Sequence, residues 1–540
     1  MKKRHGLAII ALLSAATLTL GGCSSTNQHE ASSDSAGGVH INLKGDYNPM
    51  ERDQIKDGGE LTLPIYEISE QSNSLHANSD VDTLSLCRSD NPYPVDANSV
   101  LYTLTLWRWY NPQPVLFDGD GTWHPNPAYL TNVNAEEVDG KTVVTYDINP
   151  DAVFNDDTPI DWRAFETTWK VSSGENKDFS VSSTDGYELI ESVTAGESDK
   201  QAVVTFKQPF AWWQALFNQI MHPSVSDPQI FNEGYLKNPH PEWGAGPYKV
   251  DQFDYNSGTV SFVPNEKWWG EKPKLDKVTY RQMESQATIN AYQAGEVDAV
   301  EITNKDHLAV AKTVKDTTLR GTLRPSNYLV TLNAKTPTLE DVKVREAVFT
   351  GINRETLAQV RFNGMDYTEN LPGSFALFQN QKGYQDNFGS LVTYDQDKAK
   401  QLLDEAGWAE SGDGIREKDG KKLTLRYVTF GDSQLVKSTA AAMQKMLKDI
   451  GVDLQVEERP SSDFSKVVAN LDFDFLTSGI TSYDPYGVMY FKYTYGSDSQ
   501  VNKSGTGTPE LDEQIAELEK LPTQEEQIQK ANELEKEALK

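Results

Sequence analysis

Short stretches in which apolar and polar residues alternate predict β-strands at several places along the chain. A period of two is that of a strand with one buried face, and it appears between turn residues at 61–65, 141–148 and 202–206. Elsewhere, apolar residues return every three or four positions, which is the spacing of one face of a helix. The chain is therefore predicted to fold as a mixture of strands and helices.

The clearest unit lies in the last third of the chain. Residues 422–430 alternate, residues 434–450 carry apolar side chains at helical spacing, Gly451 ends that helix, and alternation resumes over 452–457. This order predicts a β-α-β unit. Because such crossovers are almost always right-handed, the two strands should lie parallel with the helix on one face of the sheet.

A second helix is predicted from Lys398 to Ala406. Asp395 or Asp397 can cap its start, and Gly407 can end it. With the strands above, these helices place the chain in the α/β class with additional β structure.

The N-terminus has the pattern of a secretory signal over residues 1–22. A basic start is followed by the apolar stretch 7–20, which is shorter than the roughly 20 residues that span a bilayer. The run Leu20-Gly21-Gly22-Cys23 resembles the bacterial lipobox, in which the cysteine is acylated and the chain is cut just before it. The resemblance implies that Cys23 is lipidated and that the mature protein is extracytoplasmic, anchored to the cell membrane.

Residues 23–57 are predicted to be a disordered tether. They are rich in Ser, Asn, Gly, Asp and Glu and show no apolar period, so they cannot bury enough surface to become ordered. A flexible coil of this length spans roughly 30–35 Å. Such a tether would hold a globular body near a membrane.

Composition and charge restrict the partners. The formal net charge of −30 argues against binding to nucleic acid, which requires basic patches. Of the two cysteines, Cys23 is assigned to the lipid, which leaves Cys87 without a partner for an internal disulfide. The length allows two or three domains, whose stability must come from their cores.

Motifs of catalysis and metal binding are missing from the sequence. The eight histidines contain no i,i+4 pair, there is no Gly-x-Ser-x-Gly elbow or phosphate-binding loop, and Cys87 has no second thiol beside it. Carboxylates are abundant, but 80 of them make accidental proximity common. We therefore expect no cofactor, no metal and no enzymatic activity.

Three tryptophan pairs offer flat surfaces on which a peptide side chain or a sugar ring could stack; they are Trp107/Trp109, Trp212-Trp213 and Trp268-Trp269. The stretch 210–217 around the second pair is apolar at helical spacing, which is more typical of core than of a cleft. Spacing alone selects no stacking residue.

Several segments resemble, in order, motifs of the solute-binding family that includes the oligopeptide- and dipeptide-binding proteins of ABC importers. The matching segments are 154–160, 244–250, 265–269, 294–298, Asn333, 342–347, 353–354 and 399–408. In the first of them Asp157 stands where the family turn usually has Gly. Most of these motifs serve turns and packing, so they indicate the fold and not the ligand.

The resemblance implies a type II periplasmic-binding-protein fold of two α/β lobes with an extra β-rich subdomain. Lobe I is expected at 58–90 and 210–324, its subdomain at 91–209, and lobe II at 325–540, with a crossing between lobes near Arg324-Pro325. Ligand would lie between the lobes, and closure would create the form recognised by the permease.

The end of the sequence departs from the family pattern. Relatives continue past the helix expected at 524–540 with a strand and a return to lobe I, whereas this sequence stops at Lys540. Two interpretations stay open: a truncated sequence, or an incomplete lobe I.

The resemblance also implies where ligand binds. In peptide-binding relatives an Asp four residues before a Pro pairs with the ligand's α-ammonium group; counting back from Pro485 places Thr481 there. Asp484 is a possible substitute, although a turn-forming role is equally compatible with its position before Pro. The predicted ligand-binding residues are Ser478, Gly479, Thr481, Ser482 and Asp484 in lobe II, with Ser74, Leu75 and His76 in lobe I.

A hydroxyl at position 481 cannot neutralise a buried ammonium group. The site is therefore expected to favour longer peptides held by their backbone, or a neutral sugar-like ligand, over a dipeptide gripped by its amino terminus. A carbohydrate receptor, a metal-complex or haem receptor and, in another class, an extracellular hydrolase remain alternatives. The expected partners are a small solute and an ABC permease, and the protein is expected to be a monomer.

Overall fold

The structure is a computed structural model. The residues it describes are 41–42, 50–65, 68–76, 99–118, 121–283, 285–302, 304–322, 326–365, 370–379, 381–430, 434–459, 463, 467–468, 470–481, 486–497, 499 and 502–540. The predicted signal, Cys23, Cys87 and the predicted lobe crossing at Arg324-Pro325 lie outside the described residues.

The first sheet joins the predicted strand at 61–65 to strands from much later in the chain. Its order is β2 (Glu60–Ile65), β11 (Lys277–Gln282), β10 (Thr259–Pro264) and β9 (Tyr248–Asp254). β2 runs parallel to β11, and the other pairs are antiparallel. Helix α2 (Ser99–Tyr110) packs on this sheet, with the Tyr110 ring stacked on Phe262 at 5.8 Å.

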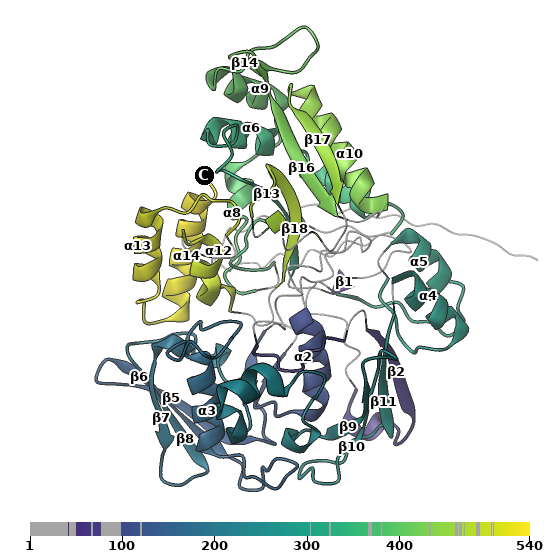
Figure 1. Cartoon of the computed structure of the whole chain (residues 1–540), viewed down its shortest axis with the longest axis vertical. Helices are drawn as coiled ribbons and strands as arrows, with labels where there is room; N and C mark the ends of the chain where they lie inside the picture. The colour runs from purple at the N-terminus through teal and green to yellow at the C-terminus, as the bar shows by residue number, and fades with distance from the viewer. Residues whose placement is uncertain are drawn as a thin grey trace, which may run out of the picture. The chain divides into compact units, whose positions relative to one another are not determined.

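The second sheet is entirely antiparallel and lies within the predicted subdomain. Its order is β5 (Leu130–Val138), β6 (Lys141–Ile148), β8 (Gln201–Phe206) and β7 (Ile190–Ala195). The predicted strands at 141–148 and 202–206 are confirmed as β6 and β8. Helix α3 (Trp162–Ser172) covers β7 and β8 (Figure 1).

The third sheet contains the predicted β-α-β unit. Its order is β13 (Ser326–Leu332), β18 (Phe475–Thr481), β16 (Thr424–Phe430) and β17 (Asp453–Arg459). β16 and β17 are parallel, and α10 (Gln434–Asp449) connects them and packs on β17 (Figure 1), as the sequence predicts. Helix α9 (Gln396–Glu405) is capped by Asp395, whose carboxylate accepts from the Lys398 N–H, and not by Asp397.

Eight further α-helices and six short strands complete the described fold. The remaining helices are α4 (Ser285–Ala294), α5 (Lys305–Ala311), α6 (Val342–Gly351), α7 (Arg354–Arg361), α8 (Asn387–Leu391), α12 (Phe491–Tyr495), α13 (Pro509–Leu518) and α14 (Gln524–Ala538). The remaining strands are β1 (Ile41–Asn42), β3 (Val115–Phe117), β4 (Trp123–Pro125), β12 (Gly321–Thr322), β14 (Glu417–Lys418) and β15 (Lys421–Lys422).

Residues 41–42 and 50–57 of the segment predicted as a tether are described by the structure and form contacts. Strand β1 at Ile41–Asn42 pairs in parallel with β12, and Arg52 forms an ion pair with Glu271 at 3.0 Å and donates to the Lys272 carbonyl. A polar composition did not prevent order here, because backbone pairing and ion pairs need no apolar side chains. The disorder predicted for 23–57 is thus corrected at the C-terminal end of that segment.

The tryptophan pairs serve mainly as core. Trp107 and Trp212 are buried, and the Trp269 indole donates to the Ala128 carbonyl at 2.7 Å. The core interpretation of 210–217 is confirmed, but the predicted helix is not: only the 3-10 turn η3 (Trp213–Ala215) forms there. Apolar residues at helical spacing were buried by the neighbouring sheet without requiring a helix.

Glu535 connects the C-terminal helices to a loop of the third-sheet region. Its side chain is fully buried, and it accepts hydrogen bonds from the N–H groups of Phe375 and Ala376 at 2.7 and 3.1 Å. It also accepts from the Tyr495 hydroxyl at 2.7 Å and the Asn387 amide at 2.6 Å. Four donors thus fix helix α14 against α12 and the 374–387 segment.

At two of the motif positions the structure gives a backbone reason for the residue that the motif prefers. The N–H groups of Ala245 and Gly246 donate to the Tyr110 carbonyl at the end of α2, and a Cβ at Gly246 would lie 2.7 Å from the Trp109 carbonyl oxygen. Asp157, in place of the usual Gly, has φ of +72°. Glycine is favoured at both places for backbone reasons, close approach at the first and a left-handed turn at the second.

We expect the left-handed conformation to decide which substitutions Asp157 tolerates. Asp157→Val should lower the free energy of unfolding by about 1–2 kcal/mol, because a β-branched side chain is strained at positive φ. Asp157→Gly should leave the free energy of unfolding close to that of the parent. It relieves the backbone strain and loses only the exposed ion pair with Lys267. Urea unfolding measures both, and equal stability of the two variants would contradict the argument.

Candidate ligand-binding site

The predicted lobe I residues lie in a turn that follows strand β2. Asn73 is completely buried and holds this turn: its side-chain oxygen accepts from the Leu75 N–H at 3.0 Å, and its amide donates to the Phe231 carbonyl at 3.0 Å. The hydroxyl of Ser74 donates to Gln219. Leu75 is only half-buried and is the most accessible of the three predicted residues.

His76 is buried beside Phe231, with ring centroids 5.8 Å apart. Burial lowers the pKa of His76 below its ordinary value, against a smaller opposite effect of a hydrogen bond with Asn232. The ring is therefore neutral at physiological pH and can supply a polar contact but not a positive charge. A site built on this turn would present polar, uncharged groups.

The predicted lobe II residues lie at the end of strand β18. Ser478, Gly479 and Thr481 pair with Leu329, Tyr328 and Ser326 of the antiparallel strand β13. Ser482 and Asp484 lie outside the described residues. The combination of this group with Ser74, Leu75 and His76 in one site stays a prediction.

Sequence spacing did not indicate the aromatic and cationic groups that surround β18. The Arg361 guanidinium lies 4.7 Å from the centroid of the Tyr328 ring, which is the cross-strand neighbour of Gly479. The Tyr427 hydroxyl and the Thr477 hydroxyl share a hydrogen bond of 2.8 Å. These residues come from α7, β13, β16 and β18, and only the fold brings them together.

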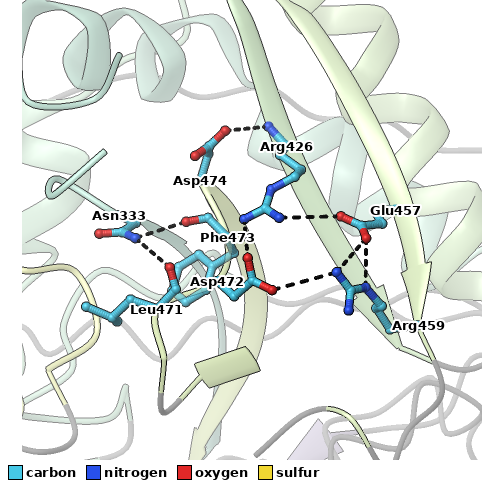
Figure 2. A network of polar contacts seen from close by, with 8 residues as sticks. All are labelled: Asn333, Arg426, Glu457, Arg459, Leu471, Asp472, Phe473 and Asp474. Carbon is cyan, nitrogen blue, oxygen red and sulfur yellow. Dashed lines mark hydrogen bonds and ion pairs between the residues drawn. The ribbon is translucent and has the colours of Figure 1, made fainter. Parts of the chain in front are cut away.

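A closed ring of four charges joins the segment before β18 to β16 and to the edge strand β17 (Figure 2). Asp472 pairs with Arg426 at 2.7 Å and with Arg459 at 3.7 Å. Glu457 pairs with the same two arginines, at 3.7 and 2.6 Å. Each arginine therefore contacts both carboxylates, and the hydrogen bond to Asp472 is the main cause that raises the pKa of Arg426.

Backbone contacts continue this ring toward β13. Asp474 accepts from the Arg426 N–H at 2.8 Å, and the Asn333 amide donates to the carbonyls of Leu471 and Phe473, both at 3.0 Å (Figure 2). The segment that leads into β18 is thus tied to both neighbouring strands.

The described residues offer few other kinds of site. No group of three or more His, Cys, Asp or Glu side chains in this part of the chain could hold a metal ion. Among its helices, none combines the length and apolar character needed to cross a bilayer.

These sheets define a class of protein, and the comparisons with known proteins agree. Mixed α/β sheets with an added antiparallel sheet are the architecture of two-lobe periplasmic binding proteins, and the solved structures that resemble this chain are of that kind. The sequence matches the model of bacterial extracellular solute-binding proteins, family 5 Middle, over residues 123–502. The chain belongs to this family.

Individual relatives cover most of the chain. It is 31% identical over 506 residues to the oligopeptide-binding protein OppA of Mycobacterium tuberculosis, spanning 92% of this chain and 81% of OppA. The solved periplasmic EDTA-binding protein EppA matches with a TM-score of 0.78, 26% identity and 89% coverage of both chains. AppA of Bacillus subtilis in complex with a nonapeptide matches with a TM-score of 0.66, 19% identity and coverage of 90% and 91%, which shows the fold alone.

The charge ring gives a testable expectation for β18. Asp472→Asn should lower the free energy of unfolding by about 1 kcal/mol, because two arginines lose a shared partner in a half-exposed network. It should also speed hydrogen exchange of the amides in 475–481. Since salt screens exposed charges, the difference from the parent should shrink in 1 M NaCl.

Asp449→Asn is the matched control for this variant. It removes a single exposed ion pair, between Lys445 and Asp449 at 3.0 Å within α10, and should leave the exchange of β18 unchanged. Equal effects of the two substitutions on β18 would contradict a positioning role for the ring.

Proposed function

We propose that this protein is the substrate-binding component of an ABC importer, which captures extracellular peptides by lobe closure and delivers them to a membrane permease. The observation that carries the proposal is the match to an oligopeptide-binding protein over 92% of the chain. The protein binds its ligand without turning it over. An extracellular hydrolase is the alternative of another class, and recovery of incubated peptides in cleaved form would favour it.

The protein is held at the membrane by a lipid on Cys23. Support comes from the lipobox-like run that ends at Cys23 and from the polar residues that follow it. Because a diacylated cysteine buries many methylene groups in the bilayer, anchoring would be firm. A tethered receptor keeps captured solute close to the permease.

Replacement of the anchoring thiol tests this part of the proposal. Cys23→Ala should release the protein into the medium or leave the signal uncleaved, because the acyl acceptor is lost. Detergent phase partitioning followed by immunoblotting measures the outcome, with Cys87→Ala as the matched control that stays anchored. A Cys23→Ala protein that partitions into detergent like the parent would disprove lipidation at this residue.

The ligand site consists of Ser478, Gly479, Thr481, Ser482 and Asp484 with Ser74, Leu75 and His76. The hydroxyl at Thr481 and the neutral His76 ring supply hydrogen bonds without a full charge. Longer peptides held by their backbone suit such a site better than dipeptides held by their amino terminus. A carbohydrate or another neutral solute on the same scaffold is the alternative ligand.

Calorimetry with tri- to nonapeptides and their N-acetylated forms tests this ligand preference. We expect acetylation to change the Kd by less than about threefold, because no carboxylate has to balance the ammonium group. Maltooligosaccharides and Fe(III)–EDTA complete the panel, the latter because EppA is described as an EDTA-binding protein. A loss of binding on acetylation that Asp484→Asn reproduces would show an amino-terminal grip and contradict the assignment of Thr481.

A further inference from the structure

The side chain of Trp212 makes a buried hydrogen bond to a residue 315 positions later. Its indole N–H donates to the Gln527 side-chain oxygen at 2.6 Å, and both side chains are almost fully buried, at 4% and 2% exposure. Trp212 follows the second sheet in the chain, and Gln527 lies on helix α14. Leaving a buried donor and acceptor without a hydrogen bond costs free energy. This bond therefore holds two segments together that are distant in the sequence.

Aromatic and polar groups surround the bond on both sides. The Tyr486 ring lies 5.7 Å from Trp212 and 5.9 Å from Phe117 of strand β3. The Gln524 amide donates to the Ala211 carbonyl at 2.9 Å and to the Gln214 side chain at 2.8 Å. We call this set, Phe117, Ala211, Trp212 and Gln214 with Tyr486, Gln524 and Gln527, the Trp212 contact.

With lobe I at 58–324 including its subdomain and lobe II at 325–540, the two halves of the Trp212 contact belong to different lobes. We propose that the Trp212 contact is a latch between the lobes, which favours the closed form independently of the ligand. The inference rests on the proposed function and its division into lobes. None of the latch residues is among the predicted ligand-binding residues, so the latch and the ligand add separately to the free energy of closure.

Helix α14 contacts both lobes: Ala531 and Leu534 lie in one apolar core with residues of the second sheet, and Glu535 is hydrogen-bonded within lobe II. On the lobe II side, the buried carboxylate of Glu535 accepts four hydrogen bonds, from Phe375, Ala376, Asn387 and Tyr495. Charge-assisted bonds of this kind are roughly twice as strong as the neutral Trp–Gln bond. On opening, the bonds of Glu535 would keep α14 with lobe II, and the Trp212 contact would separate together with the apolar packing beside it.

Like charges from the two lobes also act on one another. Burial raises the pKa of the Asp185 carboxyl, and the neighbouring Glu188 raises it further. Burial also raises the pKa of Glu519. Lys492 lowers this pKa, and Glu188 and Asp185 raise it. Carboxylates of the two lobes thus act on one another, and Lys492 lowers the pKa of both Asp185 and Glu519.

Distance measurements between the lobes, made without ligand, test the proposal. The full chain carries Cys23→Ser and Cys87→Ser, with spin labels on Glu136→Cys in β5 and Lys421→Cys in β15, both exposed positions. Trp212→Phe removes the N–H and keeps the ring. It should raise the ratio of long to short distances roughly two- to tenfold, which corresponds to one hydrogen bond.

Two further variants keep the test decisive. Gln524→Ala alters a half-buried residue on α14 that tolerates Ala, and it should shift the distances in the same direction as Trp212→Phe. Glu519→Gln removes one of the repelling charges and should shift them toward the closed form. General destabilisation would not open the lobes in Trp212→Phe and Gln524→Ala and close them in Glu519→Gln.

Trp269→Phe is the matched control, because its indole also donates at 2.7 Å, but to Ala128 within lobe I. It should leave the distances unchanged. Parental distances in Trp212→Phe and Gln524→Ala, or an equal shift in Trp269→Phe, would overturn the latch. Failure of the proposed function would show differently, as an absence of peptide binding in calorimetry while the ligand-free distance shifts persist.

Discussion

The carboxylate of Glu535 is the constraint on which the arrangement of the C-terminal third depends. A buried charge without partners costs several kcal/mol, so helix α14 can occupy only a position in which donors reach both oxygens. The N–H groups of Phe375 and Ala376, the Asn387 amide and the Tyr495 hydroxyl meet this demand. Burial and the neighbouring carboxylate raise the pKa of Tyr495, so its hydroxyl stays protonated and donates. With α14 fixed in this way, Gln524 and Gln527 face the segment around Trp212.

Polar interactions position segments of this protein, while apolar cores supply stability, one of which joins the second sheet to the C-terminal helices. The third sheet has its own core, formed by residues such as Leu425, Met443 and Phe475 between β16, α10 and β18. On this sheet the ring of Arg426, Glu457, Arg459 and Asp472 fixes the approach to β18. Such a division would suit the proposed function, in which β18 leads to the ligand and the lobes move as rigid bodies.

The two proposals address different terms of one equilibrium. Ligand residues at the turn after β2 and at the end of β18 would contribute affinity for a solute, whereas the Trp212 contact would set how often the closed form occurs without it. A receptor whose closed state is partly populated before binding loses less affinity to the conformational change. The carboxylates of Asp185, Glu188 and Glu519 would limit that population, so that solute can still enter and leave.

The sequence alone determined the elements whose signals are local. The alternation at 141–148 and the strand, helix and glycine stop at 422–451 predicted β6, β16 and α10, because burial of one face imposes a period that can be counted. The order of motifs indicated the family, and in this chain Gly246 allows the close approach of its backbone to the end of α2. Only the tertiary structure decided that 210–217 would form a short turn and that Trp212 would meet Gln527. Such partners are chosen by the packing of segments 315 positions apart, and no period in the sequence records that distance.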